Sequence, residues 1–174
     1  IGSWAFWSCE GLTSVTIPDS VTEIGDGAFE YCDNLSQVEL GNSVETIGEQ
    51  AFWIGAYSRP KITDITLPSS IREADLPGIN HVILDDSWTR IGPDVKLTGS
   101  YGTLTIPASV TEILSGNLGD MKDIRFMGTL EQWQAISSAS GFPEELRDVR
   151  VSYSDGNAGL NITGTVLKQY DGDG

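Results

Sequence analysis

The chain has 174 residues, and 25 Asp and Glu against 10 Lys and Arg give it a formal net charge of −15. This balance argues against nucleic-acid binding, and a hydrophobic content of 39% supplies enough core material to exclude a disordered acidic tail. No apolar run approaches the roughly 18 residues of a membrane-spanning helix, so membrane insertion is not expected.

The negative charge is concentrated near the N-terminal end. Residues 1–58 contain no Lys or Arg, and their acidic residues are Glu10, Asp19, Glu23, Asp26, Glu30, Asp33, Glu39, Glu45 and Glu49. Such a surface repels phosphate polymers and anionic lipids. It either keeps an extended protein soluble or steers a basic partner toward it.

An internal repeat opens the chain. Residues 1–9 read IGSWAFWSC, residues 24–32 read IGDGAFEYC and residues 47–53 read IGEQAFW, so the blocks start 23 positions apart (24 − 1 and 47 − 24). A second element, close to V-x-I-P-x-S-V, follows at 15–21 and 38–44 and again further on. A repeat of this length predicts a solenoid of stacked coils, because one unit cannot bury its apolar face alone.

Each unit carries a short predicted strand. The alternation in Val15, Thr16 and Ile17 turns two apolar side chains toward the core and the threonine outward, and Pro18 ends the strand. Applied to every coil, the same alternation places one set of residues on a common outward face. These residues are Ser14, Thr16, Gln37, Glu39, Asp64, Thr66, His81, Ile83, Thr103, Thr105, Asp123 and Arg125.

The return side of the unit is predicted to contain one helical turn, since Ala28, Phe29 and Cys32 fall at spacings that suit an inward-facing turn. Stacking of the coils then aligns Phe6, Phe29 and Phe52 into one buried column.

Later copies of the repeat are degraded but recognisable. Residues 82–84, 104–110 and 124–126 carry its strand pattern, whereas an insertion at 56–59 interrupts its regularity. The predicted fold class is α/β: a solenoid of about six coils over residues 1–127, with one short parallel strand per coil.

The unit I-G-x-x-A-F-x-x-C-x-x-L-x-x-V-x-I-P-x-S-V resembles the BspA-like leucine-rich repeats of bacterial surface proteins. The resemblance is strongest over residues 1–72 and returns at 104–113. It implies a right-handed solenoid at the cell surface or outside the cell, with a non-catalytic role in adhesion or protein binding. A structural spacer without a ligand of its own is the alternative. We expect a monomer and no enzymatic activity.

The segment GTLEQWQAI at 128–136 resembles the element that often closes arrays of this family. Thr129 is a suitable N-cap with Gln132 three residues later, so we predict a cap over 128–154 with a helix at about 130–138 and a strand at about 146–153. Trp133 is expected either to be buried in this cap or to be exposed for a ligand.

Both chain ends are expected to be cut from a longer protein. Residues 155–174 are predicted to be a linker or the start of a further block of repeats. Their Asp- and Gly-rich stretches lack the spacing of a calcium-binding loop.

Candidate chemical groups are few. Cys9 and Cys32 occupy equivalent positions whose Cα atoms would lie roughly 5 Å apart in stacked coils, which leaves buried free thiols or a disulfide as alternatives. His81 is the only histidine and is predicted to be a surface residue. The sequence carries no metal-binding, phosphate-binding or nucleophile motif, so no cofactor or metal is expected.

The candidate binding site is therefore a surface, and its ligand is expected to be a protein or a glycan. The outward strand residues proposed for it are Thr16, Gln37, Glu39, Asp64, Thr66, His81, Thr105 and Arg125. An alternative edge carries Trp7 and Trp53, which either pack against neighbouring coils or form an exposed anchor patch.

Overall fold

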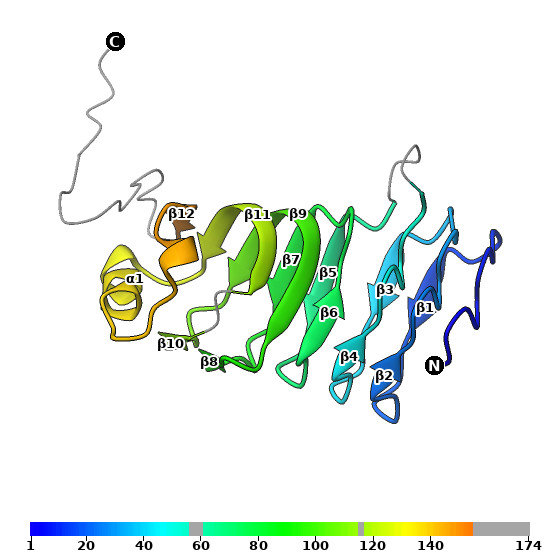
Figure 1. Ribbon diagram of the computed structural model, residues 1–174, viewed down its shortest axis with the longest axis horizontal. Coiled ribbons are helices and arrows are strands. Elements are labelled where there is room, and N and C mark those ends of the chain that lie inside the picture. Colours follow the sequence, from blue (N-terminus) through cyan, green and yellow to red (C-terminus); the bar gives the residue numbers. More distant parts are fainter. Residues whose placement is uncertain (56–60, 115–116, 155–174) are drawn as a thin grey trace, which may run out of the picture.

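The computed structural model describes residues 1–55, 61–114 and 117–154, which form an elongated stack of coils with a helix at one end (Figure 1). The elements of the first half are β1 (Ser14–Thr16), β2 (Glu23–Ile24), β3 (Gln37–Glu39), β4 (Thr46–Ile47), β5 (Asp64–Leu67), β6 (Glu73–Asp75) and β7 (His81–Leu84). Those of the second half are β8 (Arg90–Ile91), β9 (Lys96–Ile106), β10 (Glu112–Ile113), β11 (Leu118–Phe126), α1 (Leu130–Ser137), the 3-10 helix η1 (Glu144–Leu146) and β12 (Arg150–Tyr153).

One side of the stack, which we call the strand face, contains the strands expected from the alternation. It is built from β1, β3, β5, β7, the second halves of β9 and β11, and β12, and its pairings are parallel. Apolar positions align across it, with Val15 opposite Val38 and Val82 opposite Leu104. β1 and β3 form a two-stranded sheet separate from β5. The predicted insertion at 56–59 lies outside the described residues.

Each of the early coils also contributes a second strand, where the sequence predicted only one. β2, β4 and β6 pair in series, and the start of β9 continues this ladder with Leu97 opposite Ala74. Further along the stack, β8 pairs with β10. β2, β4 and β8 contain only two residues each, too few for an alternation to be recognised in the sequence.

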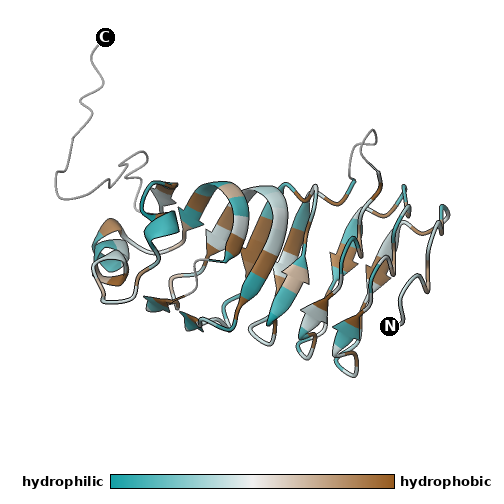
Figure 2. Ribbon diagram, in the orientation of Figure 1, coloured by the Kyte–Doolittle hydropathy of each residue, from teal (hydrophilic) through white to brown (hydrophobic). Residues whose placement is uncertain are grey.

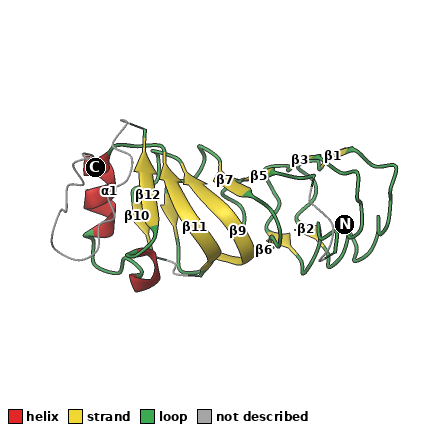
Figure 3. Cartoon of the chain, turned by 90° about the horizontal axis from the view of Figure 1, so that it is seen from above, coloured by secondary structure: helices red, strands yellow, loops and turns green. Residues whose placement is uncertain are grey.

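β9 and β11 are long because each turns a corner between the two ladders (Figure 3). The first residues of β9 pair with β6, and its later residues pair with β7. The corner of β9 lies at Gly99, with φ +92°, and that of β11 lies at Gly119, with φ +76°. A Cβ on Gly99 would lie 2.8 Å from the carbonyl carbon of Leu76, so both the backbone angle and the close approach require glycine.

The third side of the first coils is made of turns, and the helical turn predicted at Ala28, Phe29 and Cys32 does not form. Instead, backbone N–H groups alternate in direction. Ala28 donates within its own coil to Gly25, whereas Phe29 and Tyr31 donate to the carbonyls of Ala51 and Trp53 in the next coil, each at 2.8 Å. A helix would keep these donors within one coil, so the turns gain hydrogen bonds between coils that a helix would lose.

The core runs along the whole stack, and hydrophobic and hydrophilic residues alternate along its strands (Figure 2). The three phenylalanine rings stack in parallel as predicted, at 5.0 Å between the centroids of Phe6 and Phe29 and 5.3 Å between those of Phe29 and Phe52. The expectation that all three are buried is wrong for Phe6, which is 42% exposed. In the structure a coil packs against Phe6 on one side only.

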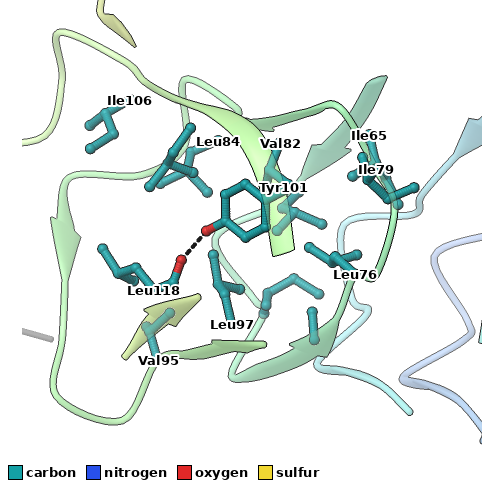
Figure 4. Packing of buried hydrophobic residues seen from close by; sticks show 14 of the residues in the cluster. Ile65, Leu76, Ile79, Val82, Leu84, Val95, Leu97, Tyr101, Ile106 and Leu118 are labelled. Atoms are coloured by element: carbon teal, nitrogen blue, oxygen red, sulfur yellow. Dashed lines mark hydrogen bonds between the residues drawn. The ribbon is translucent and has the colours of Figure 1, made fainter. Parts of the chain in front are cut away.

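In the middle of the array the core contains a polar group. Tyr101 lies among aliphatic side chains that include Leu84, Leu97 and Ile106 (Figure 4), and its hydroxyl donates a hydrogen bond to the carbonyl oxygen of Leu118. This bond satisfies the hydroxyl at a site that water does not reach.

The cap has the expected helix. Thr129 and Gln132 form a reciprocal capping box at the start of α1, and the indole of Trp133 is buried between Phe126 and Phe142. This places Trp133 in the core of the cap and not on an exposed ligand-binding surface. The terminal strand is shorter than the predicted 146–153, because Leu146 belongs to η1 and β12 begins only at Arg150.

Candidate binding surfaces

The strand face presents its outward side chains in two straight rows. Strand register places Asp64, His81, Thr103, Asp123 and Arg150 side by side in one row. The second row reads Thr66, Ile83, Thr105, Arg125 and Ser152. On β1 and β3, Ser14 faces Gln37 and Thr16 faces Glu39.

Several neighbours in these rows bind one another. Thr16 Oγ1 donates to Glu39 Oε2 at 3.1 Å, and His81 Nδ1 lies 2.6 Å from Asp64 Oδ1. The Arg150 guanidinium binds Asp123, and this contact holds the pKa of the Asp123 carboxyl below its usual range and raises that of Arg150. The sheet therefore holds these side chains in fixed positions.

Charge changes sign along the strand face. Glu39 and Asp64 make the part around β3 and β5 acidic, whereas Arg125 and the ion pair of Arg150 with Asp123 lie at the β11–β12 end. Arg125 makes no salt bridge with any of the described residues. A hollow of about 360 Å³ lies at this end, lined by Thr103, Asp123, Ile124, Arg125, Arg150, Val151 and Ser152.

A second surface carries aromatic rings. We call the turns at 2–10, 25–33 and 48–55 the aromatic side, since Trp7, Tyr31 and Trp53 form a row along them. Ring centroids lie 6.0 Å apart for Trp7 and Tyr31 and 5.6 Å apart for Tyr31 and Trp53, both in edge-on contact. Trp7 is 53% exposed, while the other two rings are half-buried. Trp7 and Trp53 therefore both pack against Tyr31 of the coil between them, and Trp7 is also exposed.

A second hollow, of about 510 Å³, lies beside the second ladder. Its lining includes four carboxylates and one ammonium group: Asp26, Glu49, Glu73, Asp75 and Lys96. Most of these groups are already bound within the protein. Asp26 and Asp75 accept backbone N–H groups of Glu49 and Gln50, each at 2.9 Å, and Glu73 binds Lys96 and raises the pKa of its ammonium group.

The two cysteines do not form a disulfide with each other. Cys9 and Cys32 are free thiols, Cys9 half-buried and Cys32 buried, and burial raises the pKa of the Cys32 thiol.

Over 1–55, 61–114 and 117–154, no group of three or more His, Cys, Asp or Glu side chains is placed to hold a metal ion. No helix in the same ranges is long and apolar enough to cross a membrane. The Asp-rich stretches after 154 lie outside the described residues.

A family model of the BspA type leucine rich repeat region matches residues 1–124 in six copies. The chain belongs to this BspA-type leucine-rich repeat family. The match covers all the coils that precede the cap, and it agrees with the solenoid of parallel strands seen in the structure.

Two solved structures are similar to this BspA-type array. One is a leucine rich repeat protein of T. pallidum, with 24% identity and a TM-score of 0.48 over 72% of this chain and 65% of that chain. The other is a leucine rich cell surface protein from Faecalibacterium prausnitzii A2-165, with 32% identity and a TM-score of 0.34 over 81% of this chain and 33% of that one. The array thus spans less than two thirds of either protein. No curated protein matches the chain significantly.

The strand residues singled out from the BspA-type pattern lie where the alternation put them. Thr16, Gln37, Glu39, Asp64, Thr66, His81 and Arg125 are exposed, and Thr105 is half-buried. Sequence reasoning missed Arg150 and Ser152, although they alternate with buried Val151 and Tyr153 in the predicted terminal strand. It also missed Tyr31, which lies between two tryptophans of neighbouring coils.

Proposed function

We propose that the chain is part of a bacterial cell-surface protein and that its strand face binds an extracellular macromolecule, either a protein or a glycan. Family membership supports the cell-surface assignment, and one similar protein is described as a leucine rich cell surface protein. The observation that carries the binding role is the pair of straight outward rows, which present hydroxyl, carboxylate and guanidinium groups from one strand to the next.

Rigidity makes such a face suitable for recognition. The outward groups stand on paired strands, and contacts such as Thr16 with Glu39 and His81 with Asp64 already restrict their side chains. The strand face then loses less conformational entropy on binding than mobile loops would. The open hollow near Arg125 adds a place for a carboxylate or another acceptor group of the ligand.

We propose a non-catalytic role. The pairing of His81 with Asp64 orients an imidazole, but both side chains are half exposed on an open face. No hydroxyl or thiol of a described residue forms a hydrogen bond with the other ring nitrogen of His81, so the pair lacks an adjacent nucleophile.

The test replaces Thr16, Glu39 and Thr66 together by Lys and measures retention on immobilised matrix proteins and glycans at low and high salt. A matched control replaces Thr22, Glu45 and Thr89 by Lys, since these exposed residues lie off the strand face and give the same change of charge. We expect the first variant to lose binding and the control to keep it. Equal binding by both variants would exclude the strand face, and a parent protein that retains no ligand would favour the spacer.

A further inference from the structure

The aromatic side combines exposed aromatic rings with an excess of negative charge. Trp4 and Trp7 are 61% and 53% exposed, which makes them the most exposed large hydrophobic residues in the described chain. Five carboxylates lie on the same turns: Glu10, Asp26, Glu30, Asp33 and Glu49. Residues 1–55 contain no Lys, Arg or His, so these coils supply no cationic side chain of their own. Lys96 of a later coil attracts Glu49, and Asp26 accepts the backbone N–H of Glu49, whereas none of the salt bridges among the described residues involves Glu10, Glu30 or Asp33.

The repeat itself turns these rings outward. Trp4 has the repeat position of Gln50, which is also exposed, and both residues have a positive φ, of 56° and 55°. Trp7 has the repeat position of Glu30 and Trp53. The hydrogen bonds from Phe6 and Ser8 to the second coil, each 2.8 Å, hold the backbone on either side of Trp7. The backbone that carries these rings is therefore hydrogen-bonded to the second coil.

A carboxylate and an indole meet at one point on this side. A Cβ built on Gly27 would lie 2.5 Å from the Trp4 ring and 3.0 Å from Glu30 Oε2, so glycine leaves room for both groups over its Cα. An indole ring and a carboxylate near each other can attract a cation in two ways, through the ring quadrupole and through the negative charge.

We propose that the aromatic side binds a Lys- or Arg-rich segment of a partner protein. Its cationic side chains would lie over the rings of Trp4 and Trp7, and the five carboxylates would attract and hold the segment. Charge complementarity selects this ligand: a neutral glycan could stack on the rings but would gain nothing from the carboxylates, and an acidic one would be repelled. This site lies away from the strand face. The two binding proposals can therefore be tested, and can fail, independently of each other.

The probe is a fluorescent peptide of alternating Gly and Arg, with a Gly and Gln peptide as the neutral reference. We expect the parent to bind the cationic peptide with an affinity that falls as the salt concentration rises. We expect no binding of the neutral peptide. The variant with Trp4→Ser and Trp7→Ser keeps the net charge, and we expect it to bind roughly ten-fold more weakly because the cation–π contacts are lost.

Two further variants separate a site from general attraction to an acidic protein. One carries Glu10→Gln, Glu30→Gln and Glu49→Gln, and the control carries Asp86→Asn, Asp120→Asn and Glu145→Gln, at exposed positions elsewhere. Both remove three charges. We expect the first to weaken peptide binding much more than the control, with unchanged urea midpoints in both. The proposal would be overturned if the two charge variants lost the same amount of peptide affinity. It would also be overturned if the tryptophan variant bound as tightly as the parent, or if the parent bound the neutral peptide as tightly as the cationic one.

Discussion

Tyr101 and Leu118 are joined by a hydrogen bond from the phenol hydroxyl to the backbone carbonyl oxygen inside the core (Figure 4). Leu118 directly precedes Gly119, the corner of β11, and the Tyr101 ring packs so close to that corner that a Cβ on Gly119 would lie 2.7 Å from it. The pair therefore ties β9 to the bend of β11.

Tyr101→Phe should lower the free energy of unfolding by about 1 to 3 kcal/mol, because it leaves the carbonyl of Leu118 buried without this donor. The ring volume is kept, so packing is not the cause of the loss. Urea unfolding followed by tryptophan fluorescence measures the change. A variant as stable as the parent would show that the carbonyl finds another donor.

Alkaline pH should act on the same residue. Burial raises the pKa of Tyr101 above its usual value near 10, because the charged phenolate is disfavoured in the core. The stability linked to this group is fully present below about pH 10 and decreases as the pH rises beyond it, by up to about 1.4 kcal/mol per pH unit. Urea midpoints measured across this range should fall more steeply for the parent than for Tyr101→Phe, and parallel curves would contradict the assignment.

The phenylalanine column offers a matched pair of truncations. Phe29→Ala should cost about 3 to 5 kcal/mol, since the ring is buried between two others and leaves a cavity. Phe6→Ala should cost less than half as much, because Phe6 is already 42% exposed and stacks on one side only. Similar losses for both variants, measured by chemical denaturation, would contradict the stacking order.

The corner of β9 should not tolerate a side chain. Gly99→Ala introduces a Cβ at 2.8 Å from the backbone of Leu76 at φ +92°, and we expect a loss of at least about 2 kcal/mol. Gly11→Ala is the control, because nothing lies within 4 Å of its added Cβ. This control should be neutral or more stable by up to about 1 kcal/mol. Thermal melts of the two proteins provide the comparison.

The capping box of α1 should show coupling. Thr129→Ala should destabilise the protein by about 0.5 to 2 kcal/mol, because the backbone N–H of Gln132 loses its acceptor. Gln132→Ala removes the reciprocal bond to the N–H of Thr129. The double variant should lose less than the sum of the two single losses, and strict additivity in a double-mutant cycle would show that the two bonds act independently.

Local sequence patterns were sufficient for much of the fold. The 23-residue spacing of the A-F blocks predicts the coils, the alternation in Val15, Thr16 and Ile17 predicts the strand face, and Thr129 with Gln132 predicts the helix of the cap. These features depend on residues that are close in sequence, or on repetition of one unit, and both can be read along a single chain.

Other features depend on how one coil sits on the next. Register between strands brings Asp64 to His81 and Asp123 to Arg150, and hydrogen bonds between coils replace the expected helical turn and place Tyr31 between Trp7 and Trp53. The sequence by itself determined the repeating unit and the direction of its strand side chains. Only the tertiary structure decided which outward side chains meet, because these contacts join residues about one coil apart whose relative offset is set by backbone pairing and not by local preference.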